Sequence, residues 1–156
     1  MTPPATLAIR PATADDVEPI LSVWELAAMA AGAGLDHDGR ARIGAHLRAS
    51  LRHPRMVVLA AVDAHDRLLG YATAHVDVHP TMDGALGVVD ELFVHPAARR
   101  AGVGRGLLAE VVTRLRAKGV HGIRLELHPA DEDAAAFAFA QGFGRGGQLW
   151  HLDVPT

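Results

Sequence analysis

The amino-acid sequence predicts an α/β domain built on a mixed sheet. Segments with helical and strand-like patterns interleave along the whole chain, in the order β-α-α-β-β-β-α-β-α-β. No Pro/Gly-rich linker divides the 156 residues, a length typical of one domain. Aromatic residues make up only 4% of the chain, so Leu, Val, Ile and Ala must fill the core. We therefore expect a single domain over residues 1–156.

The first helix is predicted to follow a short strand at residues 7–9. Thr13 and Asp16 are spaced as in a capping box, with Asp15 or Asp16 as alternative caps. Pro19 favours the later start, because proline is tolerated only in the first turn of a helix. Four apolar residues then recur at helical spacing: Val17, Ile20, Leu21 and Trp24.

A loop over residues 30–39, with small and acidic residues, leads to a second helix over 40–51. Pro54 ends that helix, because the residue before a proline is disfavoured in the helical conformation. Three strands follow, and Gly70 marks a bulge in the second of them. They are expected over 55–62, 67–78 and 86–95.

In the last third of the chain, predicted helices and strands again alternate. A helix runs to about Lys118 and is ended by Gly119, a natural residue for a left-handed helix terminus. Apolar and polar residues alternate over 122–128, as in a half-buried strand. A further helix over 131–141, with Asp131 as its N-cap, stops at Gly142, and a last strand is expected over 147–154.

Composition excludes several classes of function. A net charge of −3 does not favour a general nucleic-acid binder, and no apolar run reaches the roughly 20 residues of a membrane span. The absence of cysteine removes disulfides, thiolate metal sites and cysteine nucleophiles. The ten histidines show no compact metal-ligand spacing. We expect a cytoplasmic protein without a metal, a nucleic-acid partner or a membrane partner.

The turn after the third long strand carries the clearest functional signal. Gly102, Gly104 and Gly106 remove Cβ atoms where a strand passes into a helix, so a ligand can lie against the backbone. The N–H groups of a first helical turn attract phosphate, and three nearby arginines add positive charge. The spacing G-x-G-x-G, without a lysine and hydroxyl, does not match a P-loop or a dinucleotide fingerprint. The alternative is a glycine-rich turn whose arginines only keep it soluble.

Residues 89–112, VDELFVHPAARRAGVGRGLLAEVV, resemble the cofactor signature of the GNAT family of acyl-CoA-dependent N-acetyltransferases. Arg99 to Gly104 matches the family pattern Arg/Gln-x-x-Gly-x-Gly/Ala position for position. The stretches 9–20, 67–74 and 131–143 resemble further parts of that family, so the resemblance covers nearly the whole chain. It implies a mixed, mostly antiparallel sheet with splayed central strands and helices on both faces.

The resemblance implies acetyl-CoA as co-substrate. Its pyrophosphate would lie on backbone N–H groups of the glycine turn, and its pantetheine arm on the main chain of the third long strand. The residues implied for this role are Leu92, Phe93, Val94, Arg99, Arg100, Ala101, Gly102, Val103, Gly104, Arg105 and Asp131.

The implied reaction is direct attack of a primary amine on the thioester in a ternary complex, and Glu91 is the candidate base. The alternative is a structural carboxylate, and strand alternation predicts Asp90 and Glu91 on opposite faces. The family's usual proton-donating tyrosine is replaced by Ala138, which leaves a non-catalytic acyl-CoA-binding module as a second interpretation. His128 could donate a proton or be an exposed strand-end histidine.

The acceptor is expected to be a small-molecule or peptide amine, and a homodimer is possible. The acidic loop at 36–38 would suit a cationic amine, or would be a solvated loop with a helix cap at Asp38. His75, Asp77 and His79 alternate along one face of a strand and could line the same groove. A metal there is not expected.

Overall fold

The computed structural model describes residues 6–33, 36–78, 84–127, 132–146 and 152, and it confirms the predicted α/β class. The elements are β1 Ala8–Pro11, α1 Val17–Ala30, α2 His37–Ser50, β2 Met56–Val62, β3 Leu68–Val78, β4 Ala85–Val94, α3 Val103–Ala117, β5 Val120–Leu125 and α4 Glu132–Ala140. Nearly all of the strand predicted over 147–154 lies outside the described residues.

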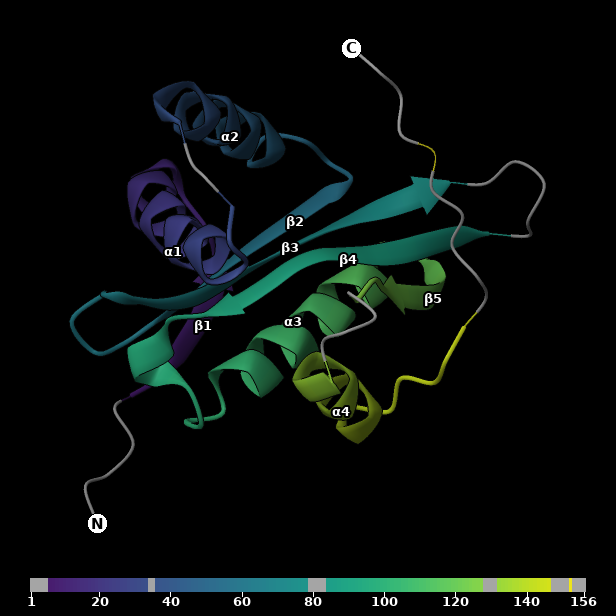
Figure 1. Cartoon of the computed structure of the whole chain (residues 1–156). Coiled ribbons are helices and arrows are strands. Elements are labelled where there is room, and N and C mark those ends of the chain that lie inside the picture. The colour runs from purple at the N-terminus through teal and green to yellow at the C-terminus, as the bar shows by residue number, and fades with distance from the viewer. Residues whose placement is uncertain (1–5, 34–35, 79–83, 128–131, 147–151, 153–156) are drawn as a thin grey trace.

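The five strands form one sheet in the order β1-β2-β3-β4-β5. The first four are antiparallel neighbours, and β5 runs parallel to β4. Helices α1 and α2 cover one face of the sheet, and α3 and α4 lie on the other (Figure 1). The sheet is therefore mixed, mostly antiparallel and covered by helices on both faces, as the resemblance implied.

A separate apolar core fills each face. The buried stripe of α3 packs against β2, β3 and β4 on one side. It consists of Val103, Leu107, Leu108, Val111 and Leu115. On the other side, Ile20 and Leu21 of α1 and Leu47 of α2 pack with Tyr71 of β3. The helical spacing of these apolar residues in the sequence is what makes each helix bury one side.

The first N-terminal helix begins where predicted, whereas the second begins three residues earlier. The α1 helix starts at Val17, after a 3₁₀ turn in which Asp16 accepts the Thr13 N–H at 2.7 Å, so the later start is confirmed. The α2 helix starts at His37 rather than Arg40, because Asp36 accepts the Gly39 N–H and acts as N-cap. The predicted cap at Asp38 is therefore wrong.

Glycines end two helices as predicted. Gly119 after α3 has φ +84° and Gly142 after α4 has φ +91°, the left-handed region that a glycine enters without steric cost. The bulge predicted near Gly70 is also present, because Ala61 pairs with Gly70 while Val62 pairs with Leu68.

Candidate active site

Strands β4 and β5 part midway along β4. Their pairing ends at Val89 and Leu125, whereas β4 continues to Val94. His95 donates its N–H to the carbonyl of Leu69 on β3 at 2.8 Å. Main-chain groups alternate in direction along a strand, so those of Leu92 and Val94 face the open edge toward β5. The main chain of Phe93 faces β3 instead.

A β-bulge lies where the two strands part. Thr73 of β3 pairs with Glu91, but the next residue, Ala74, pairs with Val89, which leaves Asp90 as the extra residue. Asp90 Oδ2 lies 2.7 Å from Nδ1 of His75, and Glu91 Oε2 accepts a hydrogen bond from Thr73 Oγ1 at 3.3 Å. Thr73 and His75 are two residues apart and share one face of β3.

Both carboxylates therefore lie on the same face of the sheet. The prediction that strand alternation separates Asp90 from Glu91 is wrong, because the bulge adds a residue and breaks the alternation. This face also carries Tyr71, which packs with α1 and α2. The site is thus built on the face of the sheet that α1 and α2 partly cover (Figure 1).

The surroundings of Glu91 make it a better proton acceptor than an exposed carboxylate. Burial is the main cause that raises the pKa of Glu91, and the neighbouring charge of Asp90 acts in the same direction. Hydrogen bonds from Thr73 and Tyr71 lower the pKa of Glu91 and partly offset this rise. Burial also raises the pKa of Tyr71, with the charge of Glu91 as a second cause, so the tyrosine stays protonated and donates.

The glycine turn leaves a row of backbone donors without partners. Arg100 and Gly102 both have positive φ, +65° and +79°, and turn the chain into α3. The first bond of the helix runs from the Gly106 N–H to the Gly102 carbonyl at 3.0 Å. Within the described part of the chain, no acceptor takes the N–H groups of residues 100–105. They lie at the positive end of the helix dipole, an arrangement that suits phosphate.

The three glycines of this turn serve different purposes. Gly102 supplies the left-handed conformation. A Cβ on Gly104 would lie 3.5 Å from Val94 Cγ2, an ordinary contact that places the turn beside the open edge of β4. A Cβ on Gly106 would lie 2.7 Å from Cδ1 of Ile9. Gly106 therefore allows β1 to approach α3, and the expectation that it exposes backbone to a ligand is wrong.

The side chains around the turn divide into exposed and buried ones. Arg99, Arg100 and Arg105 are exposed, and none forms an ion pair with another residue in the described ranges. The Arg99 guanidinium lies 5.7 Å from the centroid of the Phe93 ring. Val103 packs its side chain into the core, so only its N–H can face a ligand. Ala101 is exposed.

Other predicted site residues lie apart from this face or outside the described residues. Ala138 is 6% exposed and buried in α4, where it offers no proton donor. Phe137 packs on the core, but Phe139 is exposed. The described residues contain no cluster of three side chains able to hold a metal. Asp131, His128 and His79 lie outside the described residues.

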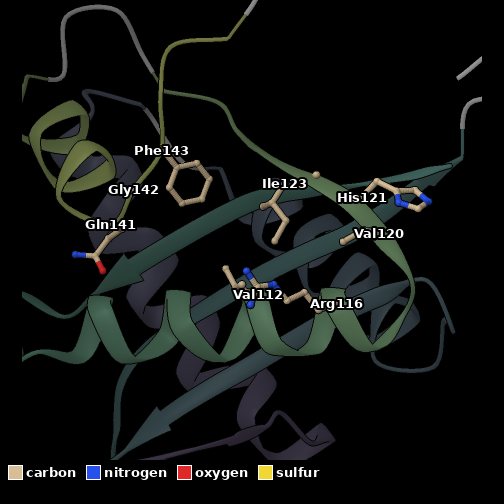
Figure 2. A pocket seen from close by; sticks show the side chains of 9 residues that line it. Val112, Arg116, Val120, His121, Ile123, Gln141, Gly142 and Phe143 are labelled. Atoms are coloured by element: carbon tan, nitrogen blue, oxygen red, sulfur yellow. The ribbon is translucent and has the colours of Figure 1, made fainter. Parts of the chain in front are cut away.

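A separate hollow of about 330 Å³ lies between α3, β5 and the end of α4. Figure 2 shows Val112 and Arg116 of α3 facing Ile123 of β5, with Phe143 beside them. It contains neither the carboxylates nor the glycine turn, so it is not part of this site.

No helix in the described ranges combines the length and apolar character that a bilayer crossing requires.

The parting of β4 and β5 beside a helix N-terminus with free N–H groups defines an α/β fold suited to an extended ligand that ends in a phosphate. The chain belongs to the acetyltransferase (GNAT) family, whose sequence profile matches residues 20–144.

Among curated proteins, the chain is 37% identical over 135 residues to a mycothiol acetyltransferase of Salinispora tropica and 33% identical over 139 residues to that of Streptosporangium roseum. The matches cover 85% and 88% of this chain, but the chain spans only 41% and 36% of the length of those relatives.

Solved structures share the fold at low identity. Aminoglycoside N-acetyltransferase AAC(6')-Iy in complex with CoA superposes with a TM-score of 0.81 at 18% identity, over 100% of this chain and 99% of its own. An aminoglycoside acetyltransferase from an uncultured soil sample, in complex with sisomicin, has a TM-score of 0.77 at 18% identity, over 96% of each chain.

Proposed function

We propose that this chain transfers an acetyl group from acetyl-CoA to a primary amine, as a single GNAT domain over residues 1–156. The observation that carries the proposal is the row of unpartnered N–H groups at residues 100–105, next to the open edge of β4. Gly104 lies between the glycine turn and Val94 of β4. Because it has no side chain, it leaves the space between these two parts of the site open to a ligand. An extended ligand with a pyrophosphate fits both parts at once.

The exposed arginines of the turn would neutralise phosphate charge, while the backbone donors fix its position. The main-chain groups of Leu92 and Val94 would hold the pantetheine arm as an added strand. Acetyl-CoA supplies the activated acyl group when bound. These assignments rest on the direction of the backbone in this chain and on the CoA complex of its structural relative.

Glu91 is proposed as the base. An amine must lose a proton to become a stable amide, and a partly buried carboxylate with a raised pKa accepts that proton more readily than an exposed one. Thr73 and Tyr71 hold the carboxylate in place through hydrogen bonds. The reaction needs no covalent enzyme intermediate, which agrees with the absence of cysteine.

The acceptor is proposed to be a cationic amine of small size. Asp90 and Glu91 both face the side from which it would approach, and a relative binds the amine-rich sisomicin. Opposite charges would draw such an acceptor to the site. A peptide amine as acceptor and a homodimeric assembly stay predictions.

A non-catalytic acyl-CoA-binding module is the second candidate, favoured by one observation. Ala138, at the position of the family's proton-donating tyrosine, is buried and inert. Protonation of the leaving thiolate by water is sufficient for turnover, since a thiol with a pKa near 8.5 is a tolerable leaving group. We therefore favour the enzyme.

Calorimetric titration with acetyl-CoA, followed by a thiol-release assay with sisomicin and spermidine, tests the proposal. Binding with amine-dependent thiol release supports acetyl transfer. Binding without release for either amine or a wider amine panel would favour the binding module. Absence of acetyl-CoA binding would overturn both interpretations of the site.

A further inference from the structure

His75 and Asp90 form a histidine–carboxylate pair beside the proposed base. His75 Nδ1 lies 2.7 Å from Asp90 Oδ2, and each side chain is 35% exposed. Among the described residues, His75 Nε2 has no partner. A carboxylate that holds one ring nitrogen orients the imidazole and leaves the other nitrogen free to exchange a proton.

The proposed acetyl transfer removes two protons from the nitrogen of the acceptor. The nitrogen of a protonated amine carries three hydrogens, and the nitrogen of the amide product carries one. Two protons must therefore leave the nitrogen, and because the Glu91 carboxylate holds only one proton at a time, a second base nearby has a role.

We propose that His75 is a second catalytic base, which takes the first proton from the incoming ammonium and thereby prepares the neutral amine. This inference rests on the acetyl transfer proposed above. His75 Nε2 accepts the proton, and the imidazolium is balanced by Asp90, which is a positioning residue. The neutral nitrogen then forms a bond to the acetyl carbon, the carbon–sulfur bond breaks, and Glu91 takes the second proton. One proton returns to the thiolate sulfur through solvent, and the other is released.

The position of the pair agrees with this order of events. The bulge turns Asp90 to the face that Glu91 occupies, and His75 lies two residues beyond Thr73, the partner of Glu91. The His75 side chain is more open to solvent than the inner part of this face, where Tyr71 is 2% exposed. An acceptor entering from solvent would therefore reach His75 before Glu91.

Other charged groups surround this pair. They are Asp77 on β3, Glu91 on β4, Arg124 on β5 and His46 on α2. Arg124 lies 4.0 Å from Asp77, so its charge is partly balanced there. Within the described part of the chain, Asp90 is the only residue that forms a hydrogen bond with the His75 ring.

The test compares wild type with His75→Gln, and with His65→Gln as the matched control. His65 lies in the turn between β2 and β3, at the other end of β3 from His75. Thiol release from acetyl-CoA is measured from pH 6 to 9.5 with whichever of sisomicin and spermidine the wild-type chain turns over. We expect kcat of His75→Gln to fall about tenfold or more at pH 7. The loss should shrink to less than about threefold at pH 9.5, where more of the acceptor is already neutral.

Two further measurements separate proton transfer from a structural role. Imidazole added to His75→Ala should restore turnover, and Asp90→Asn should lower kcat at neutral pH without changing the affinity for acetyl-CoA. A loss that is the same at every pH, or that imidazole does not reverse, would refute the role of His75. If wild type itself releases no thiol with either amine, the proposed acetyl transfer has failed, which is a different outcome.

Discussion

The substitution Gly104→Glu should abolish acetyl-CoA binding while leaving the fold intact. Residue 104 lies in the first turn of α3, beside the unpartnered N–H groups of the glycine turn. A carboxylate at this position would occupy the place proposed for the pyrophosphate, and its negative charge would repel the pyrophosphate. The same carboxylate would be favourable for the helix itself, because acidic side chains stabilise a helix N-terminus.

The magnitude follows from Coulomb's law. With the two charges about 5 Å apart and an effective dielectric constant of about 20, the repulsion is about 3 kcal/mol per unit of phosphate charge. That corresponds to a loss of affinity of about a hundredfold or more. A single methyl group should behave differently, because a Cβ at this position makes only ordinary contacts, 3.5 Å to Val94 and 3.7 Å to Phe137.

Calorimetric titration of wild type, Gly104→Ala, Gly104→Gln and Gly104→Glu with acetyl-CoA measures these effects. Gly104→Ala should change Kd less than about threefold and raise the melting temperature, since alanine stabilises a helix relative to glycine. Gly104→Gln adds the bulk without the charge and should give an intermediate loss. Unchanged affinity in a folded Gly104→Glu protein would refute the assignment of the turn.

Three more predictions concern the carboxylates. Glu91→Gln should lower kcat about tenfold or more at pH 7, measured by thiol release. Its Kd for acetyl-CoA, measured by calorimetry, should not change. Full turnover by this variant would remove Glu91 from the mechanism. Tyr71→Phe removes a hydrogen bond that lowers the pKa of Glu91, so the acidic limb of the pH–rate profile should move to higher pH; a shift to lower pH would contradict the assigned interaction. Asp16→Asn breaks the ion pair with Arg10, 2.7 Å in length, and should cost about 2–3 kcal/mol of unfolding free energy at pH 7. Burial tends to raise the pKa of Asp16, but hydrogen bonds from Arg10 and Thr13 lower it overall, so this stabilisation is present above the unfolded pKa near 3.9 and is lost as pH falls through the lower folded pKa. Denaturant titrations of both proteins should therefore converge in acid, and a constant difference down to the lowest pH would argue against the ion pair.

Much of the fold could be predicted because local patterns determine it. Apolar spacing identified the buried side of α1, and Gly119 and Gly142 identified helix ends by their backbone freedom. The free N–H groups of the glycine turn could also be predicted, because every helix N-terminus has backbone donors without intrahelical partners. These features depend on residues close together in the sequence.

The features that the sequence did not reveal depend on distant segments. The bulge at Asp90 is a property of the register between β3 and β4, and no residue type near it is diagnostic. Gly106 looked like part of a ligand cradle, but its reason is the approach of Ile9 from β1, almost a hundred residues earlier. The His75–Asp90 pair could not be found either, because strand alternation alone places Asp90 on the wrong face.

The bulge at Asp90 connects the two halves of the proposed site. The pairing of β4 with β5 ends at Val89, the residue directly before the bulge, so the open edge for an extended ligand begins there. The same extra residue brings Asp90 to the face that carries Glu91, where an acceptor amine would approach. Deletion of Asp90 would remove the bulge and its carboxylate, while Val89 and Glu91 would keep their faces because they already pair with the adjacent residues Ala74 and Thr73. Such a deletion should impair turnover more than Asp90→Asn, because it also removes the bulge at which β4 and β5 part, whereas Asp90→Asn keeps the bulge and removes only the charge.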